Sequence, residues 1–513
     1  MSEIFMTLPT RISDVFSHWA EQTPDRPALV EAGCTWTYRE LASVVAATAS
    51  WLRESGVRPG DRVMIVCENC RAFVAILFAL SQLDAWAVLV NARLSAGEVD
   101  KIRDHCGARR VIYTTSVSSH ALAHAKRHGA NVSVRAGLGA IGISALNESA
   151  QPEPVEQDVT NRVAALIYTS GTTGKPKGVM LTHRNLLFVA ATSARIRSLT
   201  PDDRFYGVLP MFHAVGLSVV LLGTLLSGAT LDLAARFDPV AAFGAIETER
   251  LTVMLGAPAM YALFLEYAKL KGIARLNTRE LRIIASASAP LQLELKSAVE
   301  ELFGMVLHNG YGVTECSPTI AQTRPEAARK DTSIGPALPG VEVRLAGIDQ
   351  RPVSDGDVGE LWVRGPNVMK GYYHAPEETA AAFNSEGWYN TRDLARMEDG
   401  NLFIAGRTKE LIVRFGFNVY PSEVEAVLDT HPAVVRSAVV GRTSQGVDGN
   451  EEIVAFVQPL PDSDVTPNDL VEYAALHLAV YRRPSEIVFL PTMPLTPTVK
   501  VAKSELMRNR EST

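Results

Sequence analysis

The sequence predicts an α/β protein with a large N-terminal domain of several parts, in which helices cover parallel sheets and a β-rich subdomain follows, and a small α+β C-terminal domain. Over the first three-quarters of the chain, short apolar segments alternate with helix-like segments, which is typical of parallel sheets. The pattern changes to hairpins from about Val341, and to a second mixture of strands and helices from about Lys409. A chain of 513 residues is also too long to fold around one compact core, so at least two domains are expected.

Hydrophobic periodicity and turn residues place the individual elements. Helices are expected over residues 38–56, 421–432 and 468–479. Strands are expected at residues 26–30, 61–66, 85–90, 109–114, 162–169, 252–258, 281–290, 305–312, 359–365, 402–407, 410–416, 435–441 and 451–458. A polar connector between Gly137 and Thr160 predicts an exposed loop, and the Glu-Asp-Gly-Asn stretch at 398–401 predicts a hairpin turn.

The stretch from Ala214 to Leu231 carries no charge. It contains glycines at 216, 223 and 228, however, and a membrane span normally needs about 20 strongly apolar residues. We therefore expect a buried helix that ends near Gly228, then a short strand, and no membrane span.

Composition narrows the classes of function. A net charge of −6 gives no electrostatic reason to expect a nucleic acid partner. The five cysteines are scattered and the N-terminus lacks a signal-peptide pattern, which together indicate a reducing, cytoplasmic environment. Cys67 and Cys70 form a CxxC pair with no histidine cluster nearby, so two half-buried structural thiols are expected there. The sequence leaves a homodimer open.

Residues 168–178 read YTSGTTGKPKG and follow a strand pattern. Glycines let backbone N–H groups approach an anion, while hydroxyls and two lysines add donors and positive charge, so this stretch predicts a phosphate-binding loop. The Walker pattern fails, because Thr169 replaces its first glycine and Pro176 its Ser/Thr. The predicted ATP contacts in this loop are Thr169, Ser170, Gly171, Thr172, Thr173, Gly174, Lys175 and Lys177.

A second stretch, NGYGVTE at 309–315, places a flat aromatic beside a hydroxyl and a carboxylate. Tyr311 could stack on adenine, and a carboxylate beside triphosphate oxygens can share a Mg²⁺ that keeps most of its waters. Glu315 is therefore the predicted metal ligand, with Thr314 beside it. Asn309, Gly310 and Gly312 complete the predicted nucleotide contacts.

These two stretches resemble the signatures of the adenylate-forming superfamily, which includes acyl- and aryl-CoA synthetases. The resemblance implies further roles in family order. Asp393, in YNTRDL, would accept hydrogen bonds from the ribose, and Arg407 would contact ribose or phosphate. Lys409 would be the hinge between domains 1–408 and 409–513, and Gly416 would line the channel for the arm of coenzyme A.

The stretch PLTPTVKVAKSEL at 494–506 resembles the superfamily's C-terminal signature. Lys500 falls on the catalytic lysine, which would bridge the substrate carboxylate and the α-phosphate of ATP. Val499 stands where the family usually has glycine. The implied activity is that of an AMP-forming carboxylic acid:CoA ligase, an acid–thiol ligase that uses ATP, Mg²⁺ and coenzyme A.

The resemblance also implies an acyl pocket. Amino-acid-activating members have an aspartate just after the phenylalanine of PMFHAVGLS, where this chain has His213 as a gate or polar contact. The candidate walls are small or apolar and uncharged, which favours an aromatic or medium-chain acid and is similar to benzoate- and 4-chlorobenzoate-type CoA ligases. They are His213, Val215, Leu255, Ala257, Ala285, Ala287, Gly310, Gly312, Cys316 and Pro318.

The thiol acceptor is less well defined by the residues. Arg483 matches a position that contacts the CoA nucleotide in aryl-CoA ligases. The Trp-Gly pair frequent in the family is missing near 444–450, which keeps a carrier-protein thiol open as the acceptor. A non-catalytic nucleotide-binding relative is a third reading, prompted by Val499.

Overall fold

The computed structural model describes residues 8–170, 176–248, 250–278, 280–347, 350–414, 417–443, 451–461, 463–494, 501–503 and 505–506. The chain forms two compact units. The first comprises residues 1–291, 295–343 and 363–389, and the second comprises 292–294, 344–362 and 390–513. The division at 408/409 stays a prediction.

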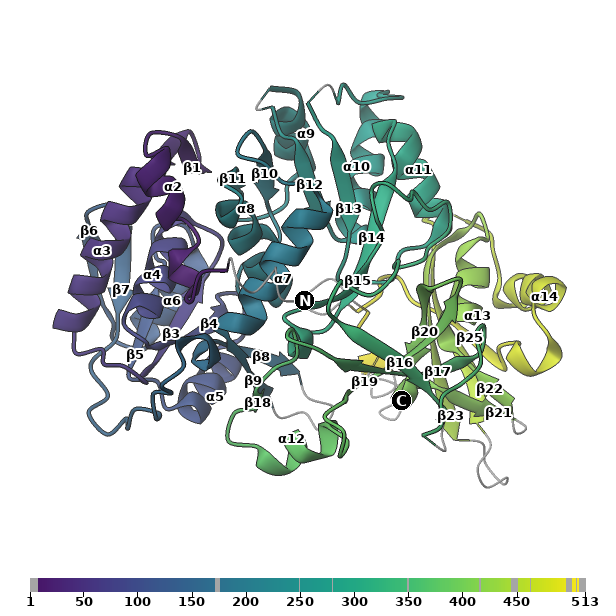
Figure 1. Ribbon diagram of the computed structural model, residues 1–513. Helices are drawn as coiled ribbons and strands as arrows, with labels where there is room; N and C mark the ends of the chain where they lie inside the picture. The colour runs from purple at the N-terminus through teal and green to yellow at the C-terminus, as the bar shows by residue number, and fades with distance from the viewer. Residues whose placement is uncertain are drawn as a thin grey trace. The chain divides into compact units, whose positions relative to one another are not determined.

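The first unit contains two eight-stranded sheets (Figure 1). Sheet 1 has the order β18-β9-β8-β4-β3-β5-β7-β6, with β8, β4, β3 and β5 parallel to one another. Sheet 2 has the order β15-β14-β13-β12-β10-β11-β1-β2 and is parallel from β14 to β1. This confirms the predicted α/β class with parallel sheets.

The strands of sheet 1 are β3 (Arg62–Cys67), β4 (Trp86–Asn91), β5 (Arg110–Tyr113), β6 (Asn131–Arg135), β7 (Gly139–Ile143), β8 (Val163–Ser170), β9 (Pro176–Thr182) and β18 (Gly371–Tyr372). Those of sheet 2 are β1 (Pro27–Glu31), β2 (Cys34–Thr37), β10 (Arg204–Gly207), β11 (Thr230–Leu233), β12 (Val253–Gly256), β13 (Ile283–Ser286), β14 (Leu307–Gly312) and β15 (Thr319–Gln322). The helices that accompany them are η1 (Ile12–Asp14), α2 (Ser17–Gln22), α3 (Tyr38–Glu54), α4 (Arg71–Gln82), α5 (Ala96–Cys106), α6 (Ser119–Arg127), η2 (Val159–Asn161), α7 (His183–Ile196), η3 (Val215–Leu222), α8 (Gly223–Leu226), α9 (Pro239–Thr248), α10 (Pro258–Lys271), α11 (Leu293–Phe303), η4 (Thr314–Cys316) and α12 (Pro376–Ala382).

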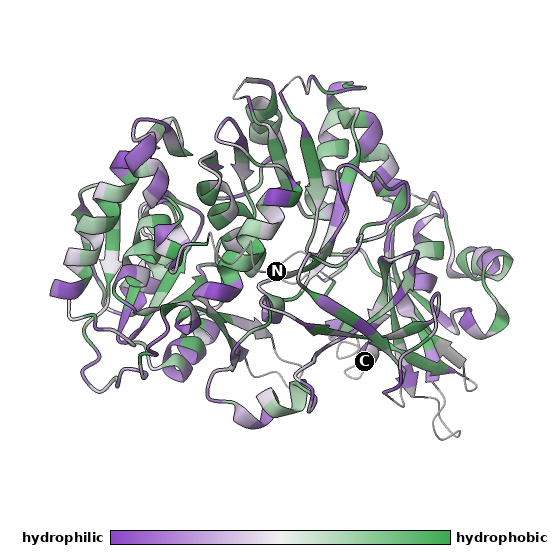
Figure 2. Ribbon diagram, in the orientation of Figure 1, coloured by the Kyte–Doolittle hydropathy of each residue, from purple (hydrophilic) through white to green (hydrophobic). Residues whose placement is uncertain are grey.

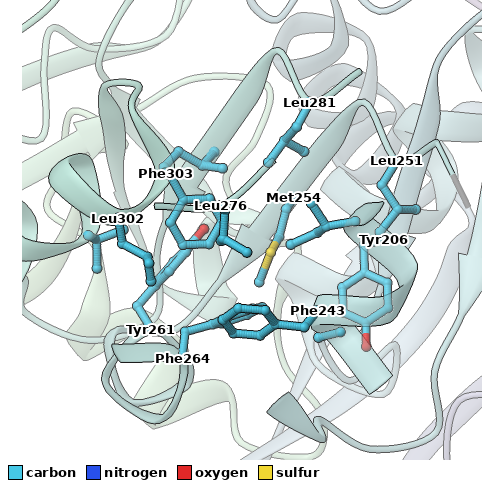
Figure 3. Packing of buried hydrophobic residues seen from close by; sticks show 14 of the residues in the cluster. Tyr206, Phe243, Leu251, Met254, Tyr261, Phe264, Leu276, Leu281, Leu302 and Phe303 are labelled. Carbon is cyan, nitrogen blue, oxygen red and sulfur yellow. The ribbon is translucent and has the colours of Figure 1, made fainter. Parts of the chain in front are cut away.

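One face of sheet 2 is covered by α9, α10 and α11. This core contains five buried aromatic side chains, and Figure 3 shows Phe243, Phe264 and Phe303 gathered beside Met254 of β12. The ring centroids of Phe243 and Phe264 lie 5.0 Å apart, and those of Phe264 and Phe303 lie 5.5 Å apart. The central strands β12 and β13 of this sheet are mostly hydrophobic (Figure 2), as expected for strands buried on both faces.

The uncharged stretch from Ala214 folds as predicted, with one refinement. Its helix begins as a π-helix, η3, and ends as α8 before Gly228, which has a φ of +73° and leads into β11. Among the described residues, no helix is long and apolar enough to cross a membrane. The predicted loop at 137–160 is wrong for its first part, because β7 there pairs with β6 in a hairpin.

The second unit has three smaller sheets, with orders β16-β17-β19-β20, β21-β22 and β23-β24-β25. Helices α13 and α14 pack on one face of the last sheet through Val424, Leu428 and Leu470. The elements are β16 (Glu342–Ala346), β17 (Val358–Arg364), β19 (Tyr389–Glu398), β20 (Asn401–Arg407), η5 (Thr408–Glu410), β21 (Ile412–Arg414), β22 (Phe417–Val419), α13 (Pro421–Asp429), β23 (Val434–Thr443), β24 (Glu451–Pro459), α14 (Pro467–His477), η6 (Val480–Arg482) and β25 (Glu486–Phe489).

His183, the first residue of α7, makes the stability of the first unit depend on pH. Its Nδ1 accepts the Ile12 N–H at 3.2 Å, and burial, with the nearby Arg11, lowers its pKa from 6.5 to about 3. The unfolded chain therefore takes up a proton first as the pH falls below about 6.5. We expect this residue to remove up to about 1.4 kcal/mol of unfolding free energy per pH unit down to pH 3.

Denaturant unfolding at pH 7.5 and 5.5 measures this effect. His183→Asn keeps an acceptor without a titrating ring, so the variant should lose less stability than the wild type between the two pH values. Equal losses in the two proteins would contradict the assignment.

Candidate active site

The predicted phosphate loop lies between two antiparallel strands. Thr169 of β8 is paired in register with Lys177 of β9, and Ser170 ends β8. A strand, not a helix, therefore follows the loop, which agrees with the failure of the Walker pattern. Gly171, Thr172, Thr173, Gly174 and Lys175 lie outside the described residues.

Three chain segments meet beside Lys177. Strand β18 pairs with β9, and the Tyr373 N–H donates to the Gly178 carbonyl at 2.8 Å. The Met369 N–H donates to the Glu315 carbonyl at 2.7 Å, which holds η4 against the same segment. Lys177, at the end of the predicted phosphate loop, and the predicted metal ligand Glu315 are thereby connected through residues 369–373.

Tyr372 contacts both of the predicted charged groups. Its hydroxyl donates to Glu315 Oε1 at 2.9 Å, and the Lys177 ammonium lies 5.1 Å from the centroid of its ring. Burial, and then the charge of Glu315, raises the pKa of the Tyr372 hydroxyl, so it is neutral at physiological pH and can donate. Burial, and then the charge of Glu315, likewise raises the pKa of Tyr389.

The backbone of the NGYG segment is tightly enclosed. A Cβ on Gly312 would lie 2.0 Å from the Pro318 carbonyl oxygen, so only glycine fits there. Asn309 is buried, and its amide donates to the Thr332 carbonyl at 3.0 Å. Gly310, Tyr311 and Thr314 are half-buried. Within the protein, the contacts of Asn309 hold the NGYG segment in place. A contact between Asn309 and ATP stays a prediction.

The predicted acyl-pocket residues gather at one edge of sheet 2. Leu255 of β12 is in register with Ala285 of β13, and the two strands are parallel, so Ala257 and Ala287 both follow carboxyl ends. The segment that carries His213 follows the carboxyl end of β10, next to β12. Ligands of open α/β sheets bind outside these ends.

Not all of these residues are equally accessible. Leu255, Ala285 and Cys316 are fully buried, and the Ala285 carbonyl accepts the Tyr261 hydroxyl at 2.9 Å. The others are half-buried, namely His213, Val215, Ala257, Ala287, Gly310, Gly312 and Pro318. His213 packs edge-on against Phe212, with ring centroids 4.8 Å apart.

Asn69 fixes the segment that leads to His213, although sequence reasoning missed it. It lies inside the CxxC stretch, and its Oδ1 accepts the Met211 N–H at 2.8 Å. Its amide donates to the carbonyls of Gly207 at 3.1 Å, Leu209 at 3.0 Å and Ala234 at 3.2 Å. Asn69 thus connects the end of β3 to the carboxyl ends of β10 and β11.

The expectation of half-buried thiols in this stretch is wrong, because Cys67 and Cys70 are both fully buried. Burial raises the pKa of Cys70 to about 12, and its Sγ accepts the Phe73 N–H at the start of α4. Both thiols are structural.

In the second unit, the predicted ribose residues face each other across a hairpin. Asp393 of β19 is in register with Arg407 of β20, and Arg407 Nε lies 3.1 Å from Asp393 Oδ1. Asp393 is buried, whereas Arg407 is largely exposed. A carboxylate that pairs with a guanidinium through one oxygen can accept hydrogen bonds from a diol with its other oxygen.

Glu360 of β17 supports this pair and was also missed. Its carboxylate accepts the Thr408 hydroxyl at 2.8 Å and the Asn390 amide at 3.0 Å. It therefore fixes the beginning of β19 and the turn η5, which contains the exposed, predicted hinge residue Lys409.

The remaining predicted residues are only partly described. Arg483 donates to the Leu478 carbonyl at 2.9 Å and to the Ala475 carbonyl at 3.0 Å, so it caps the end of α14. Gly416, Val499 and Lys500 lie outside the described residues. The nearby Lys503 pairs with Glu425 at 2.7 Å and with Glu410 at 3.2 Å.

A Mg²⁺ ion that is bound together with a nucleotide is usually held by one or two protein carboxylates, phosphate oxygens and waters. The carboxylate of Glu315 would be a ligand of this kind. In the parts of the chain that the structure describes, no group of three or more His, Cys, Asp or Glu side chains is arranged to hold a metal ion.

Comparison with known proteins decides the family. The model of the AMP-binding enzyme matches residues 16–373, and that of the AMP-binding enzyme C-terminal domain matches residues 423–500. The chain belongs to the AMP-binding enzyme family. Its enzyme class is that of the AMP-forming acid–thiol ligases, as the resemblance implied.

Individual members of the family match over nearly their whole length. A feruloyl-CoA synthase from Amycolatopsis sp is 35% identical over 95% of this chain and 97% of its own. The structure of ATP-bound MatB from Rhodopseudomonas palustris superposes with a TM-score of 0.86 at 28% identity, covering 97% of this chain and 99% of its own. The O-succinylbenzoate coenzyme A synthetase from Bacillus subtilis, in complex with ATP and magnesium, has a TM-score of 0.82 at 29% identity over 96% and 99%.

Proposed function

We propose that this AMP-binding enzyme activates an aromatic carboxylic acid with ATP and Mg²⁺ and transfers the acyl group to the thiol of coenzyme A. Apart from its carboxylate, the acid carries no charge. The substrate class is inferred from the residues at the carboxyl ends of the strands of sheet 2. There Ala257 and Ala287 follow neighbouring parallel strands, and His213 stands where an amino-acid-activating relative would carry a carboxylate. Small, uncharged residues leave width for a ring and offer no partner for a substrate amine.

The first half-reaction joins two anions. A carboxylate oxygen of the acid attacks the α-phosphorus of ATP, the bond to the pyrophosphate oxygen breaks, and acyl-AMP and pyrophosphate form. Lys500 would screen the repulsion between the carboxylate and the α-phosphate. Asp393 and Arg407 would hold the ribose, while Lys177 and the loop before it hold the phosphates. When bound at Glu315, Mg²⁺ would neutralise phosphate charge.

The second half-reaction uses the activated carbonyl. The thiolate sulfur attacks it, the bond to the AMP oxygen breaks, and a thioester and AMP form. Water must be excluded meanwhile. A rotation about Lys409 would withdraw Lys500 and present the channel at Gly416 to the thiol, with Arg483 near the CoA nucleotide. The domains 1–408 and 409–513 would be the moving parts.

The names of relatives support an aryl substrate over a medium-chain one, since ferulic acid is a substituted cinnamic acid and the relative that acts on it is 35% identical. A carrier-protein thiol remains the second candidate acceptor, because this chain lacks the Trp-Gly pair near 444–450. All five cysteines are free thiols, which supports a place in the cytoplasm. A homodimer stays a prediction that light scattering can test.

A pyrophosphate-release screen tests the proposal. Benzoates, cinnamates and saturated fatty acids are offered with ATP and Mg²⁺, first with coenzyme A and then with a phosphopantetheinylated carrier protein. We expect benzoates or cinnamates to give the highest kcat/KM, and coenzyme A to be the better acceptor. Preference for fatty acids would overturn the aryl assignment, and preference for the carrier would overturn the acceptor.

A further inference from the structure

Tyr372 stands between the two charged groups that ATP activation would use. Tyr372 lies on strand β18, which pairs with β9 so that Tyr372 is opposite Val179. The Lys370 N–H donates to the Met180 carbonyl at 3.0 Å, and the Met369 N–H to the Glu315 carbonyl at 2.7 Å. The position of its ring is therefore set by backbone bonds to both neighbouring segments.

We propose that Tyr372 is a positioning residue that orients the Glu315 carboxylate for a nucleotide-bound magnesium ion while its ring holds the Lys177 ammonium toward the phosphate loop. This proposal rests on the proposed function and adds to it a residue that acts through Glu315 and Lys177.

The hydroxyl is suited to orient a carboxylate. It donates to Glu315 Oε1 at 2.9 Å, a charge-assisted bond that fixes the rotation of the carboxylate. The single proton of Tyr372 is used in this bond. Outer groups that hold a metal-binding carboxylate in this way commonly change metal affinity by about 10-fold or more when removed.

The ring is suited to hold a cation. The Lys177 ammonium lies 5.1 Å from its centroid, within the range of a cation–π contact. A tyrosine side chain has two rotatable bonds, so a single rigid group places an anion at its tip and a cation over its face. Lys177, in register with Thr169, is thereby kept at the base of the loop.

Direct binding of ATP tests the proposal without turnover, because no acyl-adenylate forms when the acid is left out. Isothermal titration calorimetry measures the Kd of ATP with saturating Mg²⁺ and with EDTA. Tyr372→Phe removes the hydroxyl and keeps the ring. We expect its Kd for ATP with Mg²⁺ to rise about 10-fold, and its Kd in EDTA to change less than about 2-fold.

The neighbouring tyrosine offers a matched control. The Tyr373 hydroxyl donates to Glu153 Oε1 at 2.7 Å, and Tyr373 is 3% exposed, so Tyr373→Phe removes a similar bond to a carboxylate outside the predicted site. We expect this variant to bind ATP like the wild type under both conditions.

The outcomes are distinct. Binding by Tyr372→Phe equal to the wild type with Mg²⁺, or an equal loss with Mg²⁺ and EDTA, overturns the positioning role. Loss of affinity in Tyr373→Phe as large as in Tyr372→Phe also overturns it. Should Tyr372→Phe fail to fold, Tyr372→His, which keeps a ring without the phenol hydroxyl, decides by the same comparison. Absence of ATP binding in the wild type contradicts the proposed function itself.

Discussion

Lys500→Ala is expected to lower the rate of acyl-adenylate formation by about 100-fold or more, and to leave thioester formation from supplied acyl-adenylate largely unchanged. The physical reason is that only the first half-reaction brings a carboxylate against a phosphate, and loss of one group that stabilises developing charge costs about 100- to 1,000-fold. Single-turnover assays of the two half-reactions, each started from its own substrates, measure the difference.

Lys503 provides the control for this prediction. Its ammonium is engaged by Glu425 at 2.7 Å and Glu410 at 3.2 Å, so Lys503→Met removes a positive charge from the same segment but from a structural ion pair. It should reduce stability and change both half-reactions by a similar factor. Equal loss of both steps in Lys500→Ala would contradict the role assigned to that lysine.

Asp393→Ala is expected to lower kcat/KM for ATP by about 100-fold. Each hydrogen bond from a ribose hydroxyl to a charged acceptor is worth about 1.5–3 kcal/mol, and about 1.4 kcal/mol corresponds to a factor of ten, so the loss of two bonds gives at least this effect. Initial rates over a range of ATP concentrations at saturating acid provide the measurement.

Two controls isolate the ribose contact. ATP that lacks both ribose hydroxyls should be a poor substrate for the wild type, and Asp393→Ala should discriminate little between it and ATP. Asp399→Asn, in the exposed turn of the same hairpin, should leave kcat/KM unchanged, since asparagine tolerates the φ of +48° found there. Strong discrimination by Asp393→Ala would place the ribose elsewhere.

Elements with strong local signals could be predicted from the sequence. Helix α3 starts where Thr37 and Glu40 form a capping box, and the Glu40 carboxylate bonds to the Thr37 N–H at 2.7 Å. The turn between β19 and β20 falls at Asp399 and Gly400, with φ of +48° and +73°, as a tight hairpin requires. Both features depend on residues within four positions of one another.

Features that depend on distant partners could not be predicted. Tyr372 is 57 positions from Glu315, and Asn69 is 142 positions from Met211, so no local pattern marks either contact. The predicted loop at 137–160 contains the strand β7, GAIGI, because its two glycines weaken the strand pattern and its pairing with β6 is not visible in the local sequence. The expectation of half-buried thiols at Cys67 and Cys70 is wrong because β3, which ends at Cys67, is buried on both faces and α4, which Cys70 precedes, is buried on nearly all of its faces.

The candidate site shows the same division. Motifs in the sequence identify the segments that form the candidate site. Their placement within each unit is known from three contacts, namely the pairing of β8 with β9, the register of β12 with β13, and the Asp393–Arg407 pair. The groups that hold these residues in position, Tyr372, Glu360 and Asn69, are known only from the structure. The charged and hydroxyl residues of a motif predict which groups bind the substrates. The residues that hold those groups in position depend on tertiary contacts, which the local sequence does not show.

Exchange of radiolabelled pyrophosphate into ATP tests the central claim most directly, because it reports reversible formation of an acyl-adenylate without any thiol. We predict that the purified protein catalyses this exchange only when Mg²⁺ and a carboxylic acid are both present, and fastest with benzoates or cinnamates. Absence of exchange with every acid offered, by a folded protein that contains Lys500, would contradict the account.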